Sequence, residues 1–128
     1  MDNQYTFKKA ERISFQKEID CLFKQGDAFI SYPLRVVYLK QKPVSGAEVS
    51  VLIGVPKKRI KRAVKRNRIK RLIREAYRLN KTSLIQHVRE KESGLLIAFL
   101  FIGNESCSPK EPEAAIHKAL TILKEKTE

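Results

Sequence analysis

Nearly all of the excess positive charge of this chain is confined to residues 56–81. That stretch carries thirteen basic residues and a single acid, Glu75, for a formal charge of +12, whereas the whole chain carries +13. Apolar residues recur through it at helical spacing, which is not typical of a solvated basic tail. The segment is therefore predicted to form a two-faced helix that begins at Ile60 or Ala63 and ends at Leu79. The domain has to bury one face of this helix and leave the other to a polyanionic partner.

Placing successive residues about 100° apart around the helix axis separates the two faces. The arc that we expect to be buried contains Ile69, Leu72, Ile73 and Ala76. The arc that we expect to face outward contains Asn67, Lys70, Arg71, Arg74 and Arg78. Further cations crowd the first turns, where they oppose the helix macrodipole and lower helix stability. A partner that neutralises these cations would recover that stability, so the outward arc is predicted to be an interface.

The side chains on the helix favour nucleic acid over a lipid surface as the partner. Arginine outnumbers lysine, and guanidinium groups bridge two phosphate oxygens and stack on bases. A membrane-surface helix would also expose large apolar residues opposite its charges, whereas here that face is more simply explained as core. The longest apolar run, residues 95–102, is far shorter than the roughly 20 residues that span a bilayer. We therefore expect a shaped nucleic acid as the partner and no membrane.

The rest of the chain is predicted to form one α+β domain over residues 1–128. The first element is expected to be a helix at 14–24, with Ser14 as its N-cap and Gly26 as its stop. A strand at 29–39, a turn at 42–46 and a strand at 49–55 are expected to lead into the basic helix. After it we expect a short helix at 83–90, a strand at 95–102 covered on both faces, a loop at 103–112 and a helix at 113–124.

The sequence contains no group of residues with the spacing of a catalytic or metal centre. His87 and His117 lie in helical contexts without suitable partners, and the acids are scattered. Cys21 and Cys107 are isolated, which indicates neither a disulfide framework nor a metal site. The N-terminus lacks the apolar core of a secretory signal, so a cytoplasmic location is expected. We expect no catalytic centre, metal ligand or protein partner in this chain.

Residues 63–78, AVKRNRIKRLIREAYR, resemble the signature helix of the protein subunit of bacterial ribonuclease P. Residues 54–58, GVPKK, are similar to the strand end and Lys-Lys corner that precede this helix in the family. Nearer the N-terminus, Phe7-Lys8 with Glu11-Arg12, and then residues 22–26, LFKQG, are similar to its opening helix. The resemblance covers most of the chain up to about Tyr77.

Membership of this family would imply a protein component of a ribonucleoprotein that removes the 5′ leader from precursor tRNA. The RNA subunit would carry the endonucleolytic chemistry, with Mg²⁺ held mainly by the RNA. The protein would bind the catalytic RNA and the leader of the precursor tRNA. The implied fold is a two-layer α/β sandwich in which helices pack on a small mixed sheet, in the order α-β-β-(β)-α-β-α. Its βαβ crossover would be left-handed, an exception to the common rule.

The resemblance and the charge pattern together give the predicted site residues. The predicted RNA-binding set is Lys57, Lys58, Arg62, Arg66, Asn67, Arg68, Lys70, Arg71, Arg74 and Arg78. The predicted leader cleft, between the sheet and the first helix, is lined by Phe15, Ile19, Phe23 and Tyr38. Aromatic faces suit unpaired nucleotides, although Phe23 and Tyr38 also fit ordinary core or strand positions.

Three other functions fit a basic helix. A structural RNA-binding protein of the ribosomal type is the main alternative, although such proteins often carry extended basic tails. A DNA-binding module would place a turn-linked helix before the basic one, where this chain has a predicted strand and Pro56. A stand-alone nuclease would cleave without an RNA subunit.

Overall fold

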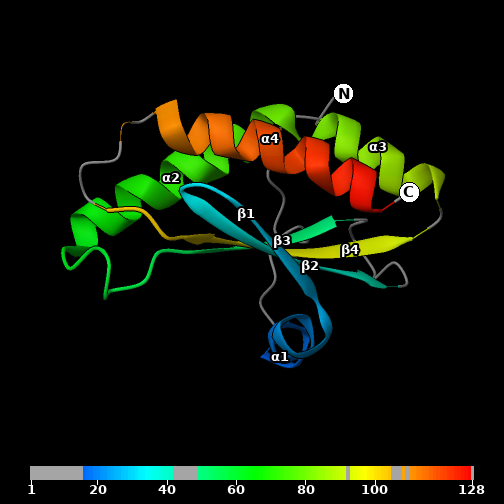
Figure 1. The fold of residues 1–128 in the computed structure, drawn as a ribbon, viewed down its shortest axis with the longest axis horizontal. Helices are drawn as coiled ribbons and strands as arrows, with labels where there is room; N and C mark the ends of the chain where they lie inside the picture. Colours follow the sequence, from blue (N-terminus) through cyan, green and yellow to red (C-terminus); the bar gives the residue numbers. More distant parts are fainter. Residues whose placement is uncertain (1–15, 42–48, 92, 105–107, 109, 128) are drawn as a thin grey trace, which may run out of the picture.

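The computed structural model describes residues 16–41, 49–91, 93–104, 108 and 110–127 (Figure 1). Over these residues the elements are α1 (Gln16–Gln25), β1 (Asp27–Ser31), β2 (Leu34–Gln41), β3 (Val49–Gly54), α2 (Ala63–Asn80), α3 (Thr82–Glu90), β4 (Gly94–Phe101) and α4 (Lys110–Lys126).

The four strands form one mixed sheet in the order β1-β2-β4-β3. β1 pairs antiparallel with β2, and β2 pairs antiparallel with β4. β3 and β4 are parallel neighbours, and the chain between them carries α2 and α3. This mixed sheet with packed helices confirms the predicted α+β class. The left-handed crossover stays a prediction.

Helices cover both faces of the sheet (Figure 1). α2, α3 and α4 lie on one face, whereas α1 lies on the other. Alternate residues of β4 point to the two faces of the sheet, because successive side chains of a strand lie on opposite sides. Ile97 and Phe99 belong to the larger core under α2 and α4, and Leu96 and Ala98 belong to a smaller core with Leu22 of α1. The prediction that this strand is covered on both faces is confirmed.

The predicted strand at 29–39 is wrong as a single strand, because the chain reverses within it. β1 and β2 form a hairpin whose last pair is Ser31 with Leu34, so Tyr32 and Pro33 make the turn. The peptide bond between them is cis. Proline has no N–H to donate to a strand ladder, so Pro33 is compatible with this unpaired turn position.

The other boundaries agree closely with the prediction, with one further correction. The basic helix begins at Ala63 rather than Ile60, and the short helix after it is present as α3. α4 begins at Lys110, inside the predicted loop at 103–112. Pro112 is compatible with this start, because the first turn of a helix needs no backbone donor there. Ser14 and the predicted turn at 42–46 lie outside the described residues.

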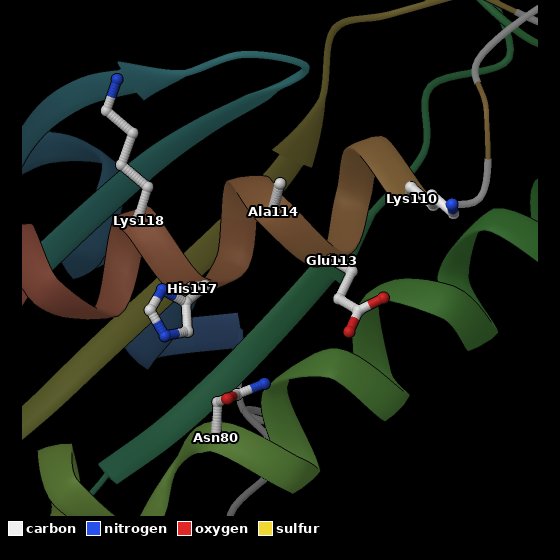
Figure 2. Close-up of a pocket in the computed structure, with 6 residues that line it drawn as sticks. All are labelled: Asn80, Lys110, Glu113, Ala114, His117 and Lys118. Carbon is white, nitrogen blue, oxygen red and sulfur yellow. The ribbon is translucent and has the colours of Figure 1, made fainter.

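An open pocket of about 460 Å³ lies between the end of α2 and α4 (Figure 2). It is lined by Asn80, Lys110, Glu113, Ala114, His117 and Lys118. Its rim mixes charges of both signs, and it is lined by none of the described residues that were predicted to bind RNA or to form the leader cleft.

Candidate nucleic-acid interface

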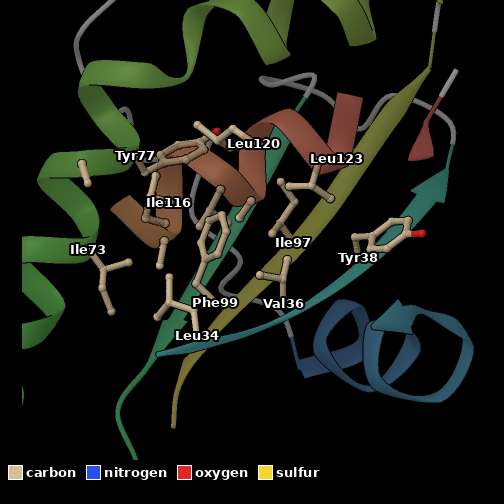
Figure 3. Close-up of a cluster of buried hydrophobic side chains, with 14 of the residues drawn as sticks. Leu34, Val36, Tyr38, Ile73, Tyr77, Ile97, Phe99, Ile116, Leu120 and Leu123 are labelled. Atoms are coloured by element: carbon tan, nitrogen blue, oxygen red, sulfur yellow. The ribbon is translucent and has the colours of Figure 1, made fainter. Parts of the chain in front are cut away.

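One side of α2 is part of the larger core (Figure 3). Ile69, Ile73, Ala76 and Tyr77 are buried, and the Tyr77 ring lies 5.9 Å from that of Phe99, centroid to centroid. The predicted buried arc is therefore confirmed for Ile69, Ile73 and Ala76, while Leu72 is half-buried. The sequence pattern did not single out Tyr77, which lies beside Ile73 on the buried side.

The opposite side of α2 exposes Asn67, Arg68, Arg71 and Arg74. We call these four residues the outward face. Lys70 and Arg78, which were predicted to share it, are half-buried at its margin. Val64 is 81% exposed, which marks the same side of the first turn as open to solvent. The core thus holds the helix so that a row of guanidinium groups points away from the sheet.

Residues 57–62, which we call the basic corner, connect β3 to α2. Lys57, Lys58, Lys61 and Arg62 are exposed, and Ile60 between them is fully buried. The Pro56 carbonyl accepts hydrogen bonds from the backbone N–H groups of residues 59 and 60, at 3.1 and 3.2 Å. This turn and the buried isoleucine shape the corner so that its cations lie on the surface.

Two arginine side chains hold the basic corner from either side. Arg59 Nη1 donates to the carbonyl oxygen of Ile102, just after β4, at 2.8 Å. Arg66 Nη1 donates to the carbonyl oxygens of Ile60 and Lys61, at 3.0 and 2.6 Å. Arg66 was predicted to bind RNA, and here part of its donor capacity is used within the protein.

The N-terminus of α2 concentrates positive charge. Arg62 occupies the N-cap position in an extended conformation without a side-chain capping bond, and the first turn contains no acid. The free backbone N–H groups of a first turn carry the positive end of the helix macrodipole. The exposed cations of the basic corner lie next to that end, so the local field favours anions.

Glu75 is the one acid in residues 56–81, which we call the basic segment, and it pairs with Arg78 one turn later. The guanidinium of Arg78 donates a hydrogen bond to Glu75 Oε1. This hydrogen bond lowers the pKa of the Glu75 carboxyl below its usual value. Glu75 is therefore ionised at neutral pH and offsets one positive charge at the margin of the outward face.

The predicted leader-cleft residues are divided between the two faces of the sheet. Ile19 packs beside the smaller core under α1, and Phe23 of the same helix is 45% exposed. The placement of Tyr38 in this cleft is corrected, because Tyr38 is buried in the larger core on the opposite face of the sheet. Its ring centroid lies 5.9 Å from that of Phe29. Burial, followed by the charge of Asp27, raises the pKa of its phenol. Phe15 lies outside the described residues.

Sequence reasoning missed two exposed residues on the α1 side of the sheet, Ile30 and Arg35. They face each other across the β1–β2 hairpin as a register pair. Arg35 alternates with Leu34 and Val36, which belong to the larger core, and so points to the α1 side. The signal that could have found both residues was Pro33, which sets the hairpin and therefore the alternation.

The described part of the chain contains no group of three His, Cys, Asp or Glu side chains that could hold a metal ion. No helix in that part is long and apolar enough to cross a membrane.

An α+β domain that buries one side of an arginine-rich helix and exposes the other defines a small, basic nucleic-acid-binding protein. A family model described as Ribonuclease P matches residues 7–124. The chain belongs to the ribonuclease P protein family.

Individual relatives agree with this assignment. The ribonuclease P protein component of Porphyromonas gingivalis is 44% identical over 116 residues, which cover 91% of this chain and 85% of that protein. The Chlorobium phaeobacteroides protein of the same description is 38% identical over 114 residues, which cover 81% of this chain and 77% of that protein. A solved structure of the Staphylococcus aureus RNase P protein has the same fold, with a TM-score of 0.68 and 21% identity. The match covers 90% of this chain and 96% of that protein.

The family decides between the functions that the sequence left open. The predicted role as the RNA-binding protein component of ribonuclease P, which acts in tRNA 5′ processing, is confirmed. This component is part of an endoribonuclease in which the RNA subunit carries the catalysis. Ribonuclease P RNA is accordingly the partner, and the ribosomal-type alternative is set aside.

Proposed function

We propose that the chain docks on ribonuclease P RNA through the outward face of α2 and the basic corner, and holds the 5′ leader of precursor tRNA against the α1 side of the sheet. In this way it assists Mg²⁺-dependent removal of the leader. The observation that carries the proposal is the exposure of the guanidinium groups on a helix that the core holds in one orientation. The same role predicts a cytoplasmic location.

The spacing of the outward face suits a shaped polyanion. Arg68, Arg71 and Arg74 follow one another every three residues, so each step rises by about 4.5 Å along the helix. Each guanidinium offers a planar fork of donors that matches two phosphate oxygens. A row of such forks on a rigid helix can select the path of an RNA backbone, which a flexible basic tail does not do.

The α1 side of the sheet supplies the chemistry for an unpaired leader. Phe23 exposes an aromatic ring on which a base can stack, and Arg35 and Ile30 provide a cation and an apolar surface on the hairpin. These residues replace Tyr38 in the proposed leader site. We expect Phe23→Ala and Arg35→Ala each to weaken binding of precursor tRNA by the reconstituted holoenzyme, with little effect on mature tRNA, which lacks a leader. Equal losses for both tRNAs would contradict this placement.

Mg²⁺ would activate the water that attacks the phosphodiester. The described residues form no carboxylate cluster that fits this ion. We therefore assign no metal ligand to the described residues and propose that the RNA holds the ion. The residues of this chain bind and orient the RNA partners.

Reconstitution tests the proposed function directly. The chain is combined with a bacterial ribonuclease P RNA, and cleavage of precursor tRNA is measured at low Mg²⁺, where the RNA alone is slow. We expect the protein to raise the cleavage rate and to lower the Mg²⁺ concentration required. No gain over RNA alone would contradict the proposal, and cleavage by the protein without RNA would indicate a nuclease centre in this chain.

A further inference from the structure

Arg59 and Arg66 each donate a hydrogen bond from the guanidinium group to a backbone carbonyl of this chain. Arg59 reaches Ile102 after β4, and Arg66 reaches back from α2 to Ile60 and Lys61. Guanidinium donors placed on carbonyl oxygens fix the path of the backbone.

These bonds connect the basic corner to three separate parts of the fold. Arg66 joins it to the first turns of α2, and Arg59 joins it to the end of β4. The N–H of Ile102 in turn donates to the Pro33 carbonyl in the β1–β2 turn, at 2.8 Å. Buried Ile60 and the turn at Pro56 complete the set of restraints. A segment without strand or helix is thereby held at both ends and in its middle.

We propose that Arg59 and Arg66 are positioning residues, which fix the basic corner so that its exposed cations are arranged for RNA phosphates before binding. The cations so placed are Lys57, Lys58, Lys61 and Arg62. Ordering side chains and loops on association costs affinity, and a pre-ordered segment avoids much of that cost. The proposal rests on the proposed docking function and adds how the corner achieves it.

Hydrogen exchange in the free protein gives the first test, with no RNA present. Arg59→Ala and Arg66→Ala are compared with Arg68→Ala, which removes an exposed arginine that has no hydrogen-bond partner among the described residues. We expect faster exchange of the backbone amides of residues 59 and 60 in the first two variants and no change in the control. Unchanged exchange in both would overturn the proposal.

Binding to ribonuclease P RNA gives the second test, through double-mutant cycles. If Arg66 positions Lys61, then removing Lys61 costs less once Arg66 is absent. We expect the loss of RNA affinity in the double variant Arg66→Ala/Lys61→Ala to be about threefold smaller than the product of the losses in the two single variants. A coupling of this size is within the usual range for residues in contact. The control pair Arg68→Ala/Lys61→Ala should be multiplicative. A multiplicative Arg66 cycle would show an independent phosphate contact and overturn the proposal.

Arg59 provides a second route should Arg66→Ala fail to fold. Arg59 is exposed, and we expect the double-mutant cycle of Arg59→Ala with Lys58→Ala to show the same shortfall from the product of the single losses. Failure of the unmodified protein to bind ribonuclease P RNA would contradict the proposed docking function, whereas the exchange result in the free protein would still stand. The two proposals can therefore fail separately.

Discussion

Replacing Arg71 with alanine removes one cation from the outward face of α2 without touching its buried side. Among the described residues Arg71 has no hydrogen-bond or ion-pair partner. Its nearest neighbours along the helix are Arg68 and Arg74, one turn away on either side, and Glu75. The substitution therefore tests the interface while leaving the fold almost unchanged.

The expected effect on stability is small. Alanine is at least as good a helix former as arginine, and substitutions at exposed positions change the free energy of unfolding by about 0.5 kcal/mol or less, which shifts the thermal midpoint by roughly 2 °C. Relief of repulsion from Arg68 and Arg74 acts in the stabilising direction.

The expected effect on RNA binding is larger and depends on salt. Hydrogen bonds to charged groups contribute about 1.5 kcal/mol or more, so loss of one phosphate contact should weaken binding about tenfold at 50 mM salt. One contact fewer lowers the slope of log affinity against log salt by about 0.7–0.9. Over a fourfold rise in salt, this slope change reduces the penalty by about threefold, to about threefold at 200 mM.

The assay is a salt titration of binding to ribonuclease P RNA, with Lys91→Ala as the matched control. Lys91 is exposed at the end of α3, outside the basic segment, and its removal changes the net charge equally. We expect the RNA affinity of Lys91→Ala to stay within about twofold of that of the unmodified protein, because a distant surface charge is largely screened. An unchanged salt slope for Arg71→Ala, or an equal change in both variants, would refute the assignment of the outward face.

Two further substitutions test the site and the fold separately. Glu75→Gln removes the acid that pairs with Arg78, so we expect tighter RNA binding and a steeper salt dependence in the same titration; weaker binding would contradict this. Gly26→Ala places a Cβ 2.4 Å from the Leu22 carbonyl oxygen and 2.8 Å from that of Tyr38, so we expect a loss of about 1–3 kcal/mol in denaturant unfolding. The control Gly54→Ala meets one flexible leucine methyl at 3.0 Å and should cost less; equal losses would argue against the backbone clash.

The elements that could be predicted from the sequence are those specified by local patterns. The basic helix shows apolar residues at helical spacing over many turns, and the structure has α2 at Ala63–Asn80. The apolar run at 95–102 lies between Gly94 and Gly103 and corresponds to the strand β4 at Gly94–Phe101, which is covered on both sides. Each signal is contained within a single element, so it needed no knowledge of how elements pair.

The hairpin and the leader side could not be predicted in the same way. Residues 29–39 are rich in strand formers on both sides of the turn, so their composition does not show a reversal. Without the turn at Pro33 there is no register, and register decides which face each side chain takes. This is why Tyr38 was placed in the cleft although it is in the larger core, and why Arg35 was missed.

The direction of a long side chain is also beyond a helical-wheel argument. The charge pattern places Arg66 among the cations that crowd the first turns, and the family resemblance places it among the RNA contacts. The structure shows a half-buried residue whose guanidinium turns back to the carbonyls of Ile60 and Lys61. Both expectations described the position of its Cα atom, and neither could follow the flexible side chain beyond it.

α2 owes little of its stability to its own sequence. Its first turn has no acid, its N-cap has no side-chain hydrogen bond, and its cations oppose the macrodipole. Burial of Ile69, Ile73, Ala76 and Tyr77 against the sheet and α4 has to offset these costs. On the proposed docking, RNA would neutralise these cations where the folded helix holds them together and would remove their opposition to the macrodipole, so we expect bound RNA to stabilise the domain by mass action. On this proposal, the charge pattern that weakens the free helix also links its folding to its partner.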